Sequence, residues 1–178
     1  MRFLETPLAD AFVIELELLG DDRGWFARTY DEELFVEHGL EPVGVQCNSS
    51  FKAAAGTLRG LHFQAAPHGE AKLVRCVQGA IWDCGVDLRP DSATYLGWHG
   101  IELSADNRRG LYLPAGLAHG FQTLTDDCEV QYLMGHVYVP ESARGVRWDD
   151  PAFAIDWPAP HGERTMSERD AGYADFVA

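Results

Sequence analysis

The sequence has few positive charges for its length. Its 178 residues include 14 lysines and arginines against 28 aspartates and glutamates, which gives a formal net charge of −14. Nucleic-acid phosphates would repel such a chain, so non-specific binding to DNA or RNA is not expected. A small anionic ligand is still compatible with this charge, because a few arginines can form a local positive site.

Long apolar runs and paired cysteine motifs are also missing. No apolar stretch approaches the ~20 residues that a membrane-spanning helix needs, and residues 1–10 lack the apolar core of a signal peptide. The cysteines show no C-x-x-C spacing, which favours free thiols in a reducing compartment. The sequence therefore predicts a cytoplasmic protein without a membrane partner. The four cysteines are Cys47, Cys76, Cys84 and Cys128.

Apolar residues make up 46% of the chain, and no repeat or low-complexity linker interrupts it. This length and composition predict one folded domain over residues 1–178. Short β-branched and aromatic segments alternate with turn residues, which is typical of an all-β sandwich or barrel. Short helices are expected at 31–38 and from the capping-box sequence S-E-R-D at 167–170. The predicted strands are 12–18, 43–51, 57–63, 72–77, 81–88, 95–103, 110–113, 121–124 and 129–139.

The stretch R-G-L-H-F-Q at 59–64 places a histidine within a predicted strand. Strand alternation puts His62 and Gln64 on one face and Arg59, Leu61 and Phe63 on the other. A single strand histidine is more often a core or surface residue than a catalytic base. Its role therefore depends on the motifs around it.

Two stretches resemble the paired motifs of the cupin superfamily, which implies a jelly roll with a few short peripheral helices. The first motif gives His62-x-Gln64, then Lys72 at the usual glutamate position and Gly79. The second is an intact P-x-G-x-x-H that ends at His119. Only two of the four usual metal ligands are present, and an ammonium beside two imidazoles would repel a divalent ion. We therefore expect no metal and no other cofactor.

A longer series of motifs resembles the dTDP-4-dehydrorhamnose 3,5-epimerase family over essentially the whole chain. Single pieces are weak signals, but their order and separations together are specific. The pieces are D-R-G-W-F at 22–26, Q-C-N-S-S at 46–50, L-R-G-L-H-F-Q at 58–64, K-L-V-R at 72–75, D-x-x-V-D-L-R at 83–89, G-x-A-H-G-F at 116–121, Y-x-x-x-x-x-Y-x-P at 132–140, R-W-D-D-P at 147–151 and S-E-R-D at 167–170.

This resemblance implies an epimerase of a nucleoside-diphosphate 4-keto-6-deoxy sugar, acting at C3, C5 or both. The C–H bonds beside the ketone are acidic, so the reaction needs a base, stabilisation of an enolate, and an acid on the opposite face. The family pattern makes His62 the base and Asp170 its partner carboxylate. Lys72 then faces the enolate oxygen and Tyr132 is the acid. His119, oriented by Asp83, is a further polar contact.

The resemblance also implies a substrate-binding set and a homodimer. The N-terminal strand region would cross to the partner subunit, and the C-terminal tail would contribute to the active site. Arginines are suited to the diphosphate because their planar fork matches phosphate oxygens. The expected substrate-binding residues are Arg23, Phe26, Arg28, Gln46, Asn48, Arg59, Tyr138 and Arg169.

Three positions depart from the family pattern. Arg28 and Ala143 stand where the family has glutamates, and Arg169 replaces a lysine. A carboxylate can accept the N3–H of thymine and a guanidinium cannot. Arg28 can instead donate to another base or pair with an acidic neighbour.

Two other functions compete with the epimerase. One is a metal-dependent cupin that uses His62 and His119 with further ligands. The other is a catalytically silent module that binds a sugar nucleotide. Taken singly, Lys72 and Arg59 could be solvated or ion-paired strand residues, Asp83 could form a structural ion pair, and Asp170 could serve only in the capping box.

Overall fold

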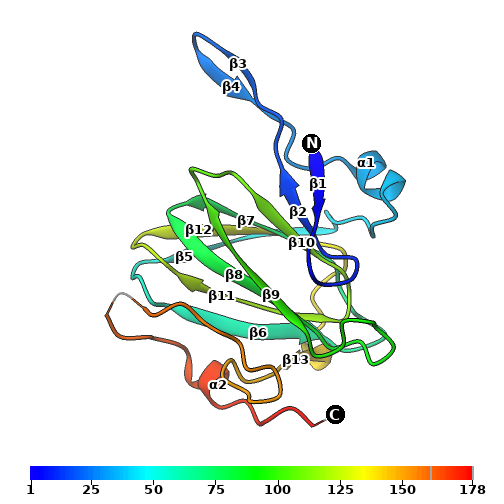
Figure 1. The fold of residues 1–178 in the computed structure, drawn as a ribbon, viewed down its shortest axis with the longest axis vertical. Helices are drawn as coiled ribbons and strands as arrows, with labels where there is room; N and C mark the ends of the chain where they lie inside the picture. Colours follow the sequence, from blue (N-terminus) through cyan, green and yellow to red (C-terminus); the bar gives the residue numbers. More distant parts are fainter. Residues whose placement is uncertain (161, 178) are drawn as a thin grey trace.

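The computed structural model describes residues 1–160 and 162–177, and two antiparallel β-sheets dominate it (Figure 1). The all-β prediction is therefore confirmed. The six-stranded sheet has the order β1 (Arg2–Glu5), β2 (Phe12–Glu15), β10 (Gly110–Leu113), β7 (Lys72–Gln78), β12 (Cys128–Met134) and β5 (Gln46–Lys52). The five-stranded sheet has the order β13 (Ala143–Gly145), β6 (Leu58–Gln64), β11 (Leu117–Thr123), β8 (Ala80–Asp87) and β9 (Trp98–Ser104).

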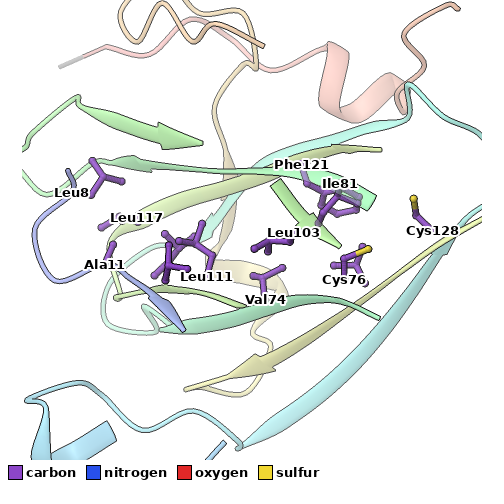
Figure 2. Packing of buried hydrophobic residues seen from close by; sticks show 13 residues of the cluster. Leu8, Ala11, Val74, Cys76, Ile81, Leu103, Leu111, Leu117, Phe121 and Cys128 are labelled. Atoms are coloured by element: carbon purple, nitrogen blue, oxygen red, sulfur yellow. The ribbon is translucent and has the colours of Figure 1, made fainter. Parts of the chain in front are cut away.

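The main core lies between these sheets. Figure 2 shows side chains from both sheets meeting there, including Val74 and Leu111 from one sheet and Ile81, Leu103 and Phe121 from the other. Each is at most 2% exposed. Burying such a side chain stabilises the fold by about 1.5–3 kcal/mol before the entropy cost of ordering it.

Short elements lie outside the two sheets. The hairpin of β3 (Leu19–Asp21) and β4 (Gly24–Phe26) projects away from the body, and α1 (Glu32–Glu37) follows it in the chain and lies beside β1 (Figure 1). The others are the 3₁₀ helix η1 (Pro140–Ser142) and α2 (Glu168–Ala171) near the C-terminus. The predicted caps are confirmed, because Asp31 and Ser167 side chains accept hydrogen bonds from the N–H groups three residues later.

Several predicted strand boundaries were wrong. The predicted strand at 12–18 ends at Glu15, and the one at 129–139 ends at Met134. After Met134 the chain turns, and the Gly135 N–H donates to the Ala71 carbonyl at 2.8 Å. Tyr138 therefore lies in a loop and not on the strand of Tyr132. Within the described ranges, none of the helices is long and apolar enough to cross a membrane.

Candidate active site

A cavity of 360 Å³ is lined by side chains from both sheets. Strands β6 and β11 of the five-stranded sheet contribute one part of the lining. Strands β5, β7 and β12 of the six-stranded sheet, with the loop after β12, contribute the rest. The lining residues are Asn48, Ser49, Ser50, Arg59, His62, Lys72, His119, Phe121, Tyr132, Met134 and Tyr138.

The two cavity histidines lie directly opposite each other on neighbouring strands, because His62 of β6 pairs in register with His119 of β11. Each has a carboxylate partner at its Nε2 atom. The His62 Nε2 lies 2.8 Å from an Asp170 oxygen, and the His119 Nε2 lies 2.7 Å from an Asp83 oxygen. The sequence therefore predicted both pairs correctly as contacts.

Asp170 combines a helix-capping position with the contact to His62. Its N–H donates to Ser167 Oγ, and its second carboxylate oxygen accepts the Gly60 N–H at 3.2 Å. Burial alone would raise the pKa of Asp170, but the hydrogen bond and charge of His62, together with the Gly60 N–H, lower it below the usual value. A charged Asp170 fixes the orientation of the ring and stabilises the imidazolium form. The two interpretations of Asp170 are thus compatible.

Asp83 is in a drier environment than Asp170. It is fully buried on β8, and its second oxygen has no hydrogen-bond partner among the described residues. Burial raises the pKa of Asp83, and the charge and hydrogen bond of His119 oppose that shift only in part. The pair therefore fixes the orientation of His119 within the cavity.

The six-stranded sheet supplies a cation and a phenol to the cavity. Lys72 begins β7, and its side chain is 8% exposed. Its Nζ lies 2.5 Å from Glu70 Oε1. Tyr132 lies on β12 with its ring centroid 6.0 Å from that of His119. Burial raises the pKa of Tyr132 well above its usual value, although the positive charge of Arg59 opposes the shift. Lys72 and Tyr132 are therefore not solvated strand residues.

Arg59 is on the opposite side of β6 from the one that regular alternation predicted. Arg59 and His62 both line the cavity, whereas Leu58 and Leu61 pack into the cluster on the other face of the sheet. The register of β6 against β11 shifts at this point, which marks a β-bulge. The bulge turns Arg59 towards Ser50, whose Oγ accepts its Nη1 hydrogen bond at 2.9 Å.

Glycine makes this bulge possible. Gly60 has a φ of 122°, and a Cβ atom there would lie 2.5 Å from the Cα of Gly120. No other residue fits so close an approach of β6 to β11. The bulge thus depends on the neighbouring strand as well as on the local sequence.

A second hollow of 460 Å³ adjoins Arg59 and His62. It is lined by Lys52, Arg59 and Arg169, together with residues of the C-terminal segment. Three cations around one hollow suit an anionic group. This arrangement brings together Arg59 and Arg169, two of the predicted substrate-binding residues. Gln46 Oε1 accepts the N–H of Tyr138, which lines the first cavity, at 2.5 Å.

In a single copy of the protein, three predicted substrate-binding residues lie far from this cavity. Arg23 and Phe26 belong to the projecting hairpin, and Arg28 follows it (Figure 1). Arg23 pairs with Asp21, and Arg28 pairs with Asp31. Arg28 therefore has the acidic neighbour that was one of its predicted alternatives. A single copy of the chain does not assemble the full predicted set.

The residues of the cavity do not fit a divalent metal. In the described part of the chain, no group of three or more histidine, cysteine or acidic side chains is placed to hold an ion. Each cavity histidine has its Nε2 beside a carboxylate, and the Lys72 ammonium lies in the same cavity. That cation would oppose a second positive charge.

Sequence reasoning missed two residues of the site. Glu70 was not in the predicted site, although its two-residue separation from Lys72 was a usable signal in an extended segment. Tyr173 was not considered, yet its ring centroid lies 6.1 Å from that of His62. The resemblance placed the C-terminal tail at the active site, but no motif singled out Tyr173.

The fold and cavity define a cupin-type jelly roll with an acid–base site, in which two histidine–carboxylate pairs, a lysine and a tyrosine surround one space. Comparison with known proteins agrees. Residues 5–177 match the family model of dTDP-4-dehydrorhamnose 3,5-epimerase, and the chain belongs to that family. The predicted class of enzyme, an isomerase, is confirmed.

Individual relatives align over nearly their whole length. The dTDP-4-dehydrorhamnose 3,5-epimerase of Methanothermobacter thermautotrophicus is 46% identical over 97% of this chain and 92% of its own. The crystal structure of the epimerase from Elizabethkingia anophelis has a TM-score of 0.95 at 40% identity, covering 99% and 96% of the two chains. The Bacillus anthracis epimerase, with TDP and PPi bound, has a TM-score of 0.92 at 41% identity, covering 98% and 99%. The predicted cupin-type fold is therefore confirmed.

Proposed function

We propose that this chain epimerises dTDP-4-keto-6-deoxyglucose at C3 and C5 by deprotonation and reprotonation next to the ketone. The family match and the TDP bound to the Bacillus anthracis relative support a thymidine-diphosphate sugar as substrate. His62 takes the C–H proton, and the charged Asp170 stabilises the resulting imidazolium. Because the His62 Nε2 is beside Asp170, the Nδ1 atom is the one available as base.

The observation that carries this proposal is the placement of His62 and Tyr132 on different sheets around one cavity. Inversion at carbon requires that the proton leave on one face and return on the other. A base and an acid that reach the sugar from two different sheets meet this requirement. The raised pKa of Tyr132 keeps its phenol protonated and able to donate.

Enolate stabilisation falls to Lys72. Deprotonation beside the ketone places negative charge on the carbonyl oxygen, and a buried ammonium stabilises that charge far more strongly than water does. His119, held by Asp83, is a further polar contact towards the sugar. Arg59 and Arg169, with Lys52 beside them, bind the diphosphate through the adjoining cationic hollow.

Proton exchange in D₂O tests this function directly. We expect the protein to introduce deuterium at both C3 and C5 of dTDP-4-keto-6-deoxyglucose. NMR measures the incorporation at each carbon. Exchange at one carbon would restrict the enzyme to one position. Saturable binding without any exchange would contradict the proposal and favour a silent binding module.

We further propose that the enzyme is a homodimer in which the N-terminal region reaches the partner. Trp25 and Phe26 on the projecting hairpin are 51% and 66% exposed, which is a large apolar surface for a lone protomer. An exchanged hairpin would carry Arg23 and Arg28 to the partner's cavity. The C-terminal tail would stay with its own domain, where Asp170 contacts His62. The free cysteines support a cytoplasmic location.

Sedimentation equilibrium tests the dimer. We expect the wild-type chain of 19.7 kDa to sediment as a dimer. The double variant Trp25→Ser/Phe26→Ser should weaken association, because it removes apolar surface that the partner would cover. Serine substitution of Val77, which is exposed on the body, is the control. A monomeric wild type at micromolar concentration would contradict this assignment.

A further inference from the structure

We propose that Glu70 is a positioning residue for the reaction: it is the counter-ion that keeps the Lys72 side chain charged and directed into the cavity. This inference rests on the proposed function for its catalytic meaning. The observations behind it are the contacts of Glu70, a residue that does not line the cavity. Lys72 lines the cavity, whereas Glu70 is outside the lining. A substrate would therefore touch the lysine and not the glutamate.

The geometry is that of a dry ion pair. The side chains of Lys72 and Glu70 are 8% and 4% exposed, and their charged atoms lie 2.5 Å apart. The second oxygen of Glu70 is buried and has no hydrogen-bond donor within reach among the described residues. The negative charge of Glu70 is thus directed at Lys72. Removing one partner of such a pair leaves the other charge buried and uncompensated.

The surroundings of Lys72 otherwise disfavour its charge. Burial lowers the pKa of Lys72, and the charge and hydrogen bond of Glu70 oppose that shift. The other groups around the cavity are Arg59, His62, His119, Tyr132 and Tyr138, none of which is a carboxylate. Two further carboxylates, Asp83 and Asp170, contact the cavity histidines and are already bonded to them.

This arrangement has a definite consequence for pH dependence. A neighbouring negative charge favours the protonated lysine, so its loss lowers the pH at which Lys72 deprotonates. In Glu70→Gln the titration of Lys72 should therefore move to lower pH by about one to three pH units, the usual effect of a close opposite charge. The alkaline limb of kcat should move in the same direction, because a neutral amine stabilises an enolate poorly. KM should change little, since substrate does not touch Glu70.

Lysine NMR makes the test clean, because the sequence contains only two lysines, Lys52 and Lys72. With ¹³C-labelled lysine, each Cε signal reports its own titration in the ligand-free protein. We expect the Lys72 midpoint to fall in Glu70→Gln and the Lys52 midpoint to stay in place, which also reports an intact fold. Glu70→Asp keeps the charge and should restore most of the wild-type midpoint. The matched control is Glu102→Gln, which replaces an exposed carboxylate on β9 with a carboxamide.

The outcomes separate this inference from the proposed function. Equal Lys72 midpoints in wild type and Glu70→Gln would overturn the inference, whatever the activity. A uniform loss of kcat at every pH, without a moved alkaline limb, would also overturn it and assign Glu70 a packing role. If the wild type fails to exchange protons into the sugar, the proposed function falls, while the lysine titration still decides whether Glu70 controls the charge of Lys72.

Discussion

Replacing His62 with asparagine should lower the rate of epimerisation by about 10²- to 10⁴-fold, the usual contribution of a positioned general base. Asparagine keeps a polar contact towards Asp170 but cannot take a proton from carbon. The pair is already formed in the structure, with 2.8 Å between ring and carboxylate, so the loss reflects chemistry and not rearrangement. The measurement is deuterium incorporation at C3 and C5 of dTDP-4-keto-6-deoxyglucose in D₂O, with binding of dTDP checked in parallel.

The matched control for this variant is His99→Asn. His99 is on β9 of the same sheet but does not line the cavity. We expect it to exchange and epimerise at the wild-type rate. Retention of exchange in His62→Asn would show that another group removes the proton. His119, paired in register with His62, would then be the next residue to replace.

Replacing Tyr132 with phenylalanine should separate the two halves of the reaction. His62 can still remove a proton, exchange it with solvent and return deuterium to the same face of the sugar. Delivery to the opposite face needs the phenol, so inversion should fall by about 10²- to 10⁴-fold while deuterium incorporation continues. One NMR time course measures both quantities. Deuterium incorporation removes the proton signal at the exchanging carbon, whereas inversion produces the signals of a new stereoisomer.

Tyr95→Phe serves as the control for the loss of a phenol, because Tyr95 is not among the residues around the cavity. If Tyr132→Phe lost exchange and inversion in equal proportion, the phenol would act in deprotonation or in substrate placement, and its assignment as the acid would be wrong. An unchanged dissociation constant for dTDP would then favour a role in deprotonation, and a raised one would favour a role in substrate placement. The packing of Tyr132 against the main core makes a thermal melt a necessary companion measurement.

Sequence motifs predicted the central part of the site well. His62, Lys72, His119 and Tyr132 do surround one cavity, and Asp170 and Asp83 do contact the two histidines. These positions follow from motifs whose order and spacing are specific to the family. The strands that carry His62, Lys72 and Tyr132 were predicted as well, because apolar segments bounded by turn residues are a local property of the chain. His119 lies before the predicted strand at 121–124, and the structure places it on β11.

The tertiary structure alone decided the features that depend on neighbours distant in sequence. Arg59 lies on the same side of β6 as His62 because a bulge forms where Gly60 meets Gly120, and strand alternation contains no information on that contact. Tyr138 lies beyond the end of β12, although the predicted strand at 129–139 included it, because the chain turns after Met134.

The charge of Lys72 is the clearest example of a property that only the tertiary structure decides, because it depends on how deeply the fold buries the side chain. The sequence by itself determined the all-β class, the family and the chemical types of the site residues. Only the folded structure decided which charges are buried together, such as Lys72 with Glu70, and which predicted residues the chain holds away from its own cavity, such as Arg23 and Arg28. The physical reason is that burial and register are set by packing between segments, whereas motif and periodicity are properties of a single segment.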